Sequence, residues 1–335
     1  MKILVTGSSG FIGFHFSKLL LEKGHQVHGI DSMNSYYDVK LKKARLNILT
    51  KYKKFSFTKI NLQNDRKIKN IFKKFRPKIV VHLAAQAGVR YSIHEPRVYL
   101  SSNIDGTFNV IEAAHKIKVK HLIMASSSSV YGGNKKLPFK EIDKTESQLS
   151  IYAATKKANE SMAHSYSNIW KIPITMLRFF TVYGPWGRPD MALFKFTKGI
   201  INGKSIDVYN KGKMFRDFTY IDDVVKGIYL LLNKIPNKKQ FGKYKYDSLS
   251  NVAPFRILNI GNKKKILLLD FLKEIEIRLS KKANKNFKPL QKGDVKRTLS
   301  NIDLLKSITG YNPKTNYKEG INKFVKWYKN YYKKN

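Results

Sequence analysis

A glycine-rich segment directly after the first apolar run constrains the fold of this chain more than any other feature. Residues 6–13 read Thr-Gly-Ser-Ser-Gly-Phe-Ile-Gly, between the apolar run Ile3–Thr6 and the amphipathic stretch Phe11–Lys23. Glycines at this spacing let the backbone turn tightly after a strand, approach a bound pyrophosphate and begin a helix that faces it. The segment therefore predicts a strand, a phosphate-binding turn and a helix.

An acidic residue ends the second apolar run, Gln26–Asp31, eighteen residues after Gly13. A carboxylate at this position can accept both ribose hydroxyls of a dinucleotide and repels a 2′-phosphate, and no arginine follows closely to receive one. The sequence thus predicts NAD rather than NADP as cofactor. The residues expected to bind it are Gly7, Gly10, Phe11, Ile12, Gly13 and Asp31.

Short apolar runs alternate with helical periods up to about residue 180. This rhythm is typical of a parallel sheet covered by helices on both faces, which predicts a Rossmann-type, doubly wound α/β fold. The predicted strands are Ile3–Thr6, Gln26–Asp31, Phe55–Asn61, Ile79–Leu83, His121–Ala125 and Ile174–Arg178, and the predicted helices are Phe11–Lys23, Asp65–Phe75, Asn103–Ile117 and Tyr152–Trp170.

The rhythm changes at residue 181, where a loop rich in glycine and proline, Gly184–Pro189, precedes a mixture of helices and short strands. Residues 1–180 are predicted to form the NAD-binding domain, with about 212–232 and 255–262 returning to it. Residues 181–335 are predicted to form a smaller C-terminal α/β lobe that binds the substrate. The Lys-rich segment Lys234–Val252 is expected to be a surface insertion. Four helices are expected in this part: Ala192–Asn202, Asp222–Asn233, Leu269–Leu279 and Tyr317–Tyr332.

The composition excludes several classes of protein. The chain has no cysteine, which rules out disulfides and thiolate metal sites, and no metal site is predicted. The N-terminus begins a strand pattern without a signal peptide, and no apolar stretch reaches the ~18 residues of a membrane span. A cytoplasmic protein without a membrane partner is predicted.

A formal net charge of +42 raises the alternative of a nucleic-acid-binding protein. Lysine outnumbers arginine 54 to 11, however, and the lysines are spread over almost every polar segment. Arginine is the better bidentate ligand for phosphate and bases, so a diffuse lysine excess favours solvated surfaces that attract small anions. No nucleic-acid partner is predicted.

Candidate catalytic groups lie in two segments. Tyr152 and Lys156 are one helical turn apart, so an ammonium lies near a phenol and is expected to lower its pKa. The serine run Ser126–Ser129 follows a predicted strand, at the sheet edge where parallel α/β proteins bind ligands. Tyr152, assisted by Lys156 and Ser127, is therefore predicted to take a hydroxyl proton while a hydride leaves the same carbon.

Together these motifs resemble the extended short-chain dehydrogenase/reductase family of nucleotide-sugar enzymes. Within it the chain is similar to the UDP-glucuronate 4-epimerases, through the segments Ile30–Asp38, His82–Ser92, Leu177–Ala192 and Arg216–Asp223. The resemblance implies epimerisation of UDP-glucuronate at C4, through a 4-keto intermediate and with a retained NAD.

The resemblance also implies the remaining site residues. Ser129 would lie over the sugar, Thr181 and Arg188 would hold the carboxylate, and Arg216 and Asp294 would hold the UDP diphosphate and ribose. Asn61 stands where the family usually has Asp, and Gln291 where galactose epimerases have Arg. The full cofactor set adds Asn34, Asn61, Leu62, Leu83, Ala84, Ala85, Gln86, Asn103, Tyr152 and Lys156, and the substrate set is Val89, Arg90, Ser127, Ser128, Ser129, Tyr152, Thr181, Arg188, Ala192, Phe196, Ile206, Val208, Tyr209, Arg216, Gln291 and Asp294.

Related reactions are disfavoured at two positions. Dehydratases of this family carry an Asp-Glu pair where Ser128 and Ser129 stand, and decarboxylases have Glu in place of Ser129. The open alternatives are epimerisation of UDP-glucose or UDP-N-acetylglucosamine, decarboxylation of UDP-glucuronate, and a non-catalytic NAD-binding regulator. The family resemblance implies a homodimer joined by the helices Asn103–Ile117 and Tyr152–Trp170.

Overall fold

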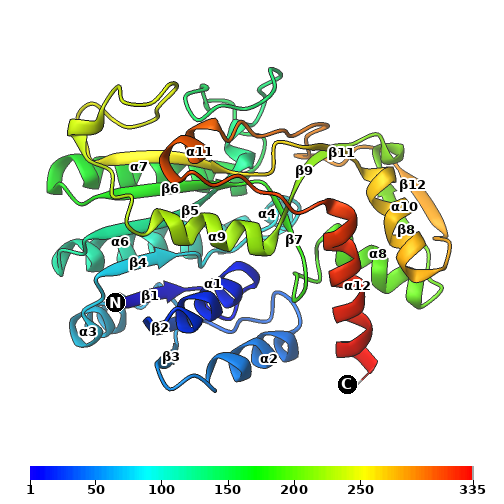
Figure 1. Ribbon diagram of the computed structural model, residues 1–335, viewed down its shortest axis with the longest axis horizontal. Helices are drawn as coiled ribbons and strands as arrows, with labels where there is room; N and C mark the ends of the chain where they lie inside the picture. Colours follow the sequence, from blue (N-terminus) through cyan, green and yellow to red (C-terminus); the bar gives the residue numbers. More distant parts are fainter. Residues whose placement is uncertain (334–335) are drawn as a thin grey trace.

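The computed structural model describes residues 1–333, which fold around a seven-stranded parallel sheet (Figure 1). The strand order is β10-β6-β5-β4-β1-β2-β3. The order reverses between β1 and β4, and in open α/β sheets ligands bind at such a point, beyond the carboxyl ends of the strands. The bounds are β1 (Lys2–Thr6), β2 (Gln26–Asp31), β3 (Phe55–Lys59), β4 (Ile79–His82), β5 (His121–Ser127), β6 (Ile174–Phe179) and β10 (Phe255–Ile260).

Helices cover both faces of this sheet. Side chains alternate across a strand, so Ile3 and Val5 face one core and Leu4 the other. One face is covered by α1 (Phe11–Glu22), α2 (Val39–Leu49) and α9 (Ile221–Leu231), and the other by α3 (Asp65–Phe75), α6 (Gly106–Lys116) and α7 (Ile151–Trp170). The predicted Rossmann-type fold is confirmed, and each predicted strand of the first 180 residues is present with its ends shifted by at most two residues.

Helix α2 was not predicted from the sequence. Its buried side chains are Leu41, Lys42, Arg45 and Leu49. Because two of the four residues that face inward are cations, the segment lacks the apolar stripe that marks an amphipathic helix. A helix of the first part also begins later than expected, since residues 100–105 form a π-helical turn before α6.

A smaller lobe lies beside the carboxyl ends of the sheet and includes the long C-terminal helix α12 (Tyr317–Lys333) (Figure 1). A three-stranded sheet in the order β11-β9-β7 and a parallel pair of β12 with β8 connect its helices. The bounds are β7 (Thr181–Tyr183), α8 (Ala192–Ile201), β8 (Ile206–Tyr209), β9 (Phe215–Tyr220), β11 (Lys265–Leu267), α10 (Leu268–Leu279), β12 (Lys285–Lys288) and α11 (Asp303–Thr309); the short helices elsewhere are α4 (Tyr91–His94), α5 (Pro96–Tyr99), η2 (Ser128–Tyr131), η3 (Asn210–Gly212) and η4 (Lys238–Gln240).

The segments 212–232 and 255–262, predicted to return to the NAD-binding domain, join the large sheet and its helices only in part. Strand β10 pairs with β6, and α9 packs against α1, whereas β9 belongs to the small sheet. The segment 234–252 is partly exposed but is tied to β10 by an ion pair in which Arg256 donates to both oxygens of Asp247, at 3.0 and 3.1 Å. The division into two domains stays a prediction.

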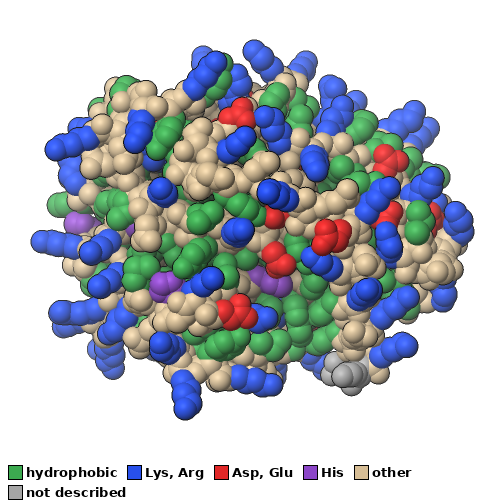
Figure 2. Space-filling model, in the orientation of Figure 1, with side chains coloured by type: hydrophobic (Ala, Val, Ile, Leu, Met, Phe, Trp, Pro, Cys, Tyr) green, Lys and Arg blue, Asp and Glu red, His purple; other side chains and the backbone are tan. Residues whose placement is uncertain are grey.

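The surface is rich in cations without a single stripe. Figure 2 shows Lys and Arg side chains distributed over the whole visible face, over elements of both lobes. Within residues 1–333, no helix combines the length and the apolar character that crossing a bilayer requires.

Candidate active site

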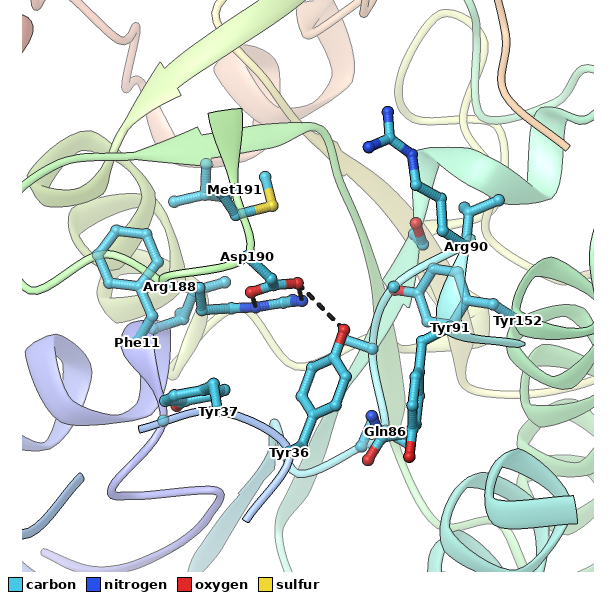
Figure 3. Close-up of a pocket in the computed structure, with 18 of the residues that line it drawn as sticks. Phe11, Tyr36, Tyr37, Gln86, Arg90, Tyr91, Tyr152, Arg188, Asp190 and Met191 are labelled. Atoms are coloured by element: carbon cyan, nitrogen blue, oxygen red, sulfur yellow. Dashed lines mark hydrogen bonds and ion pairs between the residues drawn. The ribbon is translucent and has the colours of Figure 1, made fainter. Parts of the chain in front are cut away.

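A cavity of about 1180 Å³ lies at the carboxyl ends of the strands, between the sheet and the smaller lobe. This volume exceeds the roughly 300–1,000 Å³ of a typical single-ligand pocket, so two ligands fit side by side. Figure 3 shows residues from distant parts of the chain converging on it. The predicted residues that line it are Gly7, Gly10, Phe11, Ile12, Gly13, Asp31, Asn34, Asn61, Leu62, Leu83, Ala84, Ala85, Gln86, Val89, Arg90, Ser127, Ser128, Ser129, Tyr152, Lys156, Thr181, Arg188, Ala192, Phe196, Ile206, Tyr209, Arg216 and Asp294.

The glycine-rich turn forms one wall. Gly7 has a positive φ of 72°, and a Cβ there would lie 2.8 Å from the amide nitrogen of Ala84. A Cβ on Gly13 would lie 2.0 Å from the carbonyl oxygen of Gly7. Both positions therefore require glycine, because any side chain would push the turn away from β4 or from α1. Helix α1 begins after Gly10 without a side-chain cap, and its first residues line the cavity, so its N-terminal amides are left for a ligand there.

Asp31 is fixed at the end of β2. Its carboxylate accepts hydrogen bonds from the backbone amides of Ser9, at 3.1 Å, and Met33, at 2.8 Å. Lys42 of α2 lies nearby and donates to the backbone and side-chain oxygens of Asn34, both at 2.7 Å. Burial lowers the pKa of Lys42 to about 8, against the opposing charge of Asp31. Sequence reasoning missed Lys42, which belongs to the unpredicted helix.

Gln86 follows β4 in the wall of the cavity and is held in place by Asn103. Asn103 is fully buried; its amide oxygen accepts from the Gln86 backbone N–H at 2.8 Å, and its amide nitrogen donates to the Gln86 carbonyl at 3.0 Å. Asn103 therefore orients Gln86 and does not line the cavity, which corrects the expectation of a direct contact. Its second donor bond, to Thr155 at 3.1 Å, ties this wall to α7.

The three predicted catalytic residues meet where β5 ends and α7 begins. Ser150 caps α7 by accepting from the Ala153 amide, which places Tyr152 in the first turn. Lys156, one turn later, donates to the Ala125 carbonyl of β5 at 2.8 Å. Ser127 accepts from the Ser129 amide at 3.1 Å and hydrogen-bonds with Tyr152. A phenol, a hydroxyl and an ammonium are thus brought together at the cavity.

The pKa of Tyr152 differs from the expectation. Burial raises it, while the hydrogen bond with Ser127 and the positive charge of Arg188 oppose the rise. The predicted lowering is wrong for this structure, because burial outweighs the favourable charges. Burial also lowers the pKa of Lys156 to about 8, against the opposing charge of Glu160.

A buried ion pair holds the floor beneath the serine run. Arg178 of β6 donates to both carboxylate oxygens of Glu160, each at 2.9 Å, and Ser126 donates to Glu160 at 2.6 Å. The two charged side chains are each 2% exposed. They join β5, β6 and α7 directly behind the catalytic residues.

Arg188 lies on the opposite wall, paired with an acid that sequence reasoning missed. Its Nε donates to Asp190 at 3.0 Å and its Nη2 at 2.5 Å, and the Tyr36 hydroxyl donates to the same carboxylate at 3.1 Å (Figure 3). The guanidinium expected to bind a substrate carboxylate is therefore already oriented by a protein carboxylate. The motif that contains Arg188 also contains Asp190, so this pair was available in the sequence.

The far end of the cavity carries a charged cluster. Asp294 accepts from Arg216 at 2.9 Å and from Arg90 at 3.4 Å, and the Arg90 guanidinium lies 4.3 Å from the centre of the Tyr209 ring. Two expected residues do not line this end. Val208 is fully buried in the core, since alternate residues of β8 face inward, and Gln291 lies in the loop before Asp294 without lining the cavity.

Residues 3–246 match the model of the family described as "NAD dependent epimerase/dehydratase family". The chain belongs to this family. The match spans the glycine-rich turn, the serine run, Tyr152, Lys156 and Arg188. Membership of the epimerase/dehydratase family thus agrees with the geometry of the cavity.

Several relatives extend over the whole chain. It is 52% identical to "Protein CapI" of Staphylococcus aureus, covering all of both chains. It is 44% identical to "UDP-glucuronate 4-epimerase 4" of Arabidopsis thaliana, over 99% of this chain and 76% of that one. The solved UDP-glucuronic acid 4-epimerase of Bacillus cereus, in complex with UDP-glucuronic acid and NAD, superimposes with a TM-score of 0.89 at 33% identity, over 99% of this chain and 100% of that one.

Proposed function

We propose that this chain converts UDP-glucuronate to UDP-galacturonate by epimerisation at C4, with NAD as resident cofactor. The observation that carries the proposal is the position of Arg188 opposite Ser127 and Tyr152, in a cavity that also contains the glycine-rich turn. A proton acceptor and a carboxylate-binding cation thus face the same space. The relatives named for this reaction support the choice of substrate.

The cofactor end of the cavity suits a dinucleotide. The close approach at Gly7 and the uncapped N-terminus of α1 suit a pyrophosphate, and Asp31 has lone pairs left for ribose hydroxyls. When bound there, NAD would supply a hydride acceptor for C4 of the sugar. The hydroxyls of Ser8 and Ser9 in this turn are buried and have no hydrogen-bond partner among residues 1–333.

Tyr152 and Ser127 handle the proton of the C4 hydroxyl. Ser127 hydrogen-bonds with the phenol, so the two oxygens can share one substrate hydroxyl between them. Tyr152 in its phenolate form takes the proton as the 4-keto sugar forms and gives it back when the hydride returns on the other face. Lys156, anchored on the Ala125 carbonyl, holds its positive charge one helical turn from the phenol.

Arg188 and Thr181 hold the carboxylate of the sugar. A 4-keto glucuronate is a β-keto acid, and it loses CO₂ when the bond to the carboxylate aligns with the ketone π system. A planar guanidinium that binds the carboxylate in two places prevents this alignment. Asp190 and Tyr36 fix the guanidinium before substrate arrives, which reduces the freedom lost on binding.

The nucleotide end is held by the charged cluster. Arg216 and Arg90 supply positive charge for the diphosphate, and Asp294 supplies a carboxylate for a ribose hydroxyl. Ile206 and Tyr209 line the cavity there and offer surfaces for the uracil ring. The pairing with Asp294 orients both guanidinium groups toward one position.

The proposal includes a cytoplasmic homodimer joined through α6 and α7. Trp170 packs on His115 with ring centres 4.5 Å apart, and Ile169 beside it is 59% exposed. Leu100 and Phe108, before and on α6, are 51% and 42% exposed. Such apolar side chains gathered on two helices favour burial against a second copy. Light scattering after size-exclusion chromatography measures the mass in solution, and a monomer at all concentrations contradicts this part.

The first test incubates the purified protein with UDP-glucuronate, adds no NAD and follows the products by NMR. Formation of UDP-galacturonate supports both the C4 chemistry and a retained cofactor. UDP-pentose with CO₂ as the main product identifies a decarboxylase. Conversion of UDP-glucose or UDP-N-acetylglucosamine, with UDP-glucuronate untouched, overturns the role given to Arg188.

A further inference from the structure

Helix α2 contains a buried cation whose hydrogen bonds join two loops of the site. Arg45 is 0% exposed, and across residues 1–333 no carboxylate lies within ion-pair distance of it. Its Nη1 donates to the Ser9 carbonyl in the glycine-rich turn at 3.0 Å. Its Nη2 donates to the carbonyls of Trp186 and Gly187, at 2.6 and 3.2 Å. One guanidinium thus connects the cofactor turn to the residues directly before Arg188.

A second side chain holds the same loop. The imidazole of His15, on α1, hydrogen-bonds the Pro185 carbonyl at 2.9 Å. Burial lowers the pKa of His15 to about 3, so the ring is neutral and its Nε2 carries the hydrogen that it donates. The backbone carbonyls of residues 185–187 therefore all accept hydrogen bonds from side chains of α1 and α2. Arg188 is the next residue.

The loop needs this support because its backbone is unusual. Trp186 has a φ of 59°, in the left-handed region that residues other than glycine seldom adopt without tertiary contacts. Its ring lies between Phe14 of α1 and Trp327 of α12, at centre distances of 5.6 and 5.2 Å. The ring contacts fix the side chain, and the bonds from Arg45 and His15 fix the peptide groups.

We propose that Arg45, assisted by His15, is a positioning residue that fixes Arg188 relative to the glycine-rich turn and so couples cofactor binding to the hold on the substrate carboxylate. This inference rests on the function proposed above. An arginine is required, since its planar fork donates in two directions at once, whereas a lysine offers a point charge that cannot reach both loops with the same geometry. Loss of the hydrogen bonds from Arg45 is expected to weaken NAD binding and also to misplace Arg188.

The variants Arg45→Lys and Arg45→Met test this positioning role. Misplacement of a binding group by about 1 Å can cost about 100-fold in rate, so kcat/KM for UDP-glucuronate should fall by up to about that factor, with a larger share of UDP-pentose. NAD affinity, measured by calorimetry on protein stripped of nucleotide, should fall in both variants. Arg256→Lys is the matched control, because Arg256, at 2% exposed, is likewise buried but pairs with Asp247 away from the cavity. The control should change stability without changing product ratio or NAD affinity.

Combination with Arg188→Ala separates positioning from general destabilisation. If Arg45 acts through Arg188, adding Arg45→Met to Arg188→Ala should not increase the UDP-pentose share further. An additive increase, or Arg45 variants that differ from the Arg256 control in no property, overturns the inference. Failure of the proposed function is distinguished by the unsubstituted protein, which would then not convert UDP-glucuronate, while the NAD measurement still tests the link between Arg45 and the glycine-rich turn.

Discussion

The hydroxyl of Tyr36 donates a hydrogen bond to the carboxylate of Asp190, 154 residues further along the chain, at 3.1 Å. Tyr36 lies in the loop after β2, and Asp190 pairs with Arg188 on the opposite wall (Figure 3). The bond joins the cofactor side of the cavity to the residue that is proposed to hold the substrate carboxylate.

Replacing Tyr36 by Phe removes this hydrogen bond and keeps the ring. A bond to a charged group contributes about 1.5–3 kcal/mol when buried, and the half-buried position of Tyr36 places the effect at the lower end. We expect KM for UDP-glucuronate to rise several-fold, with kcat little changed, because only the orientation of Arg188 is relaxed. Steady-state kinetics measure this, with Tyr91→Phe, whose ring packs on Tyr36, as control. An equal loss in both variants would contradict a specific role of the hydrogen bond between Tyr36 and Asp190.

Replacing Tyr152 by Phe removes the proposed proton acceptor. Proton transfer by a positioned side chain accelerates a reaction about 10²–10⁴-fold. The turnover rate of the variant should therefore fall by at least about 10²-fold. Bound NAD should remain, because the turn at Gly7 and the carboxylate of Asp31 are untouched. Turnover is followed by NMR, and retained NAD by release of nucleotide on denaturation. Turnover near that of the unsubstituted protein contradicts the assigned role.

Activity should fall above pH 8. Burial lowers the pKa of Lys156 to about 8, so its ammonium loses its proton there, and we expect the positive charge one helical turn from the Tyr152 phenol to be lost. Because this pKa is below the ordinary 10.5, the unfolded chain binds the extra proton between pH 8 and 10.5, and the contribution of Lys156 to stability rises over this window. A falling kcat/KM without loss of folding is therefore expected.

The variant Glu160→Gln tests the cause of this pH dependence. The charge of Glu160 opposes the lowering, so its removal should move the alkaline limb of kcat/KM to lower pH. Circular dichroism at each pH checks that the protein stays folded. A limb that does not move excludes Lys156 as the titrating group.

The buried pair of Glu160 and Arg178 should dominate local stability. Removing one partner of such a pair costs about 3–5 kcal/mol, because the other charge is left buried alone. Glu160→Ala is therefore expected to lower the free energy of unfolding by about that amount in a urea titration. The exposed pair of Lys69 and Asp65 is the control, since pairs of this kind contribute about 0.3–0.5 kcal/mol. Equal effects of Glu160→Ala and Asp65→Ala would contradict the assignment.

The parts of the structure that sequence reasoning predicted are those set by local chemistry. The glycine-rich turn, the acid that ends β2 and the alternation of strands with helices each follow from neighbouring residues, and they gave the sheet and the cofactor end. Helix α2 was missed because Lys42 and Arg45 face inward. Lys42 donates to the carbonyl of Asn34 in the preceding loop, and Arg45 donates to the carbonyl of Trp186, which is far away in the sequence. Asn103 was predicted to contact NAD and Val208 to contact the substrate. In the structure Asn103 hydrogen-bonds the backbone of Gln86, and Val208 packs in the hydrophobic core.

The proposed binding of the substrate carboxylate by Arg188 leads to the sharpest prediction about substrate and product specificity. Without Arg188, the 4-keto intermediate can turn so that the bond to its carboxylate aligns with the ketone, and CO₂ is lost. We expect Arg188→Ala to raise KM for UDP-glucuronate and to increase the share of UDP-pentose, while any turnover of UDP-glucose, which has no carboxylate, changes less. Arg188→Lys keeps the charge but cannot bind a carboxylate in two places, so its product ratio should lie between those of the unsubstituted protein and Arg188→Ala. NMR of the product mixture measures all three proteins, and unchanged kinetics without UDP-pentose would remove Arg188 from the site.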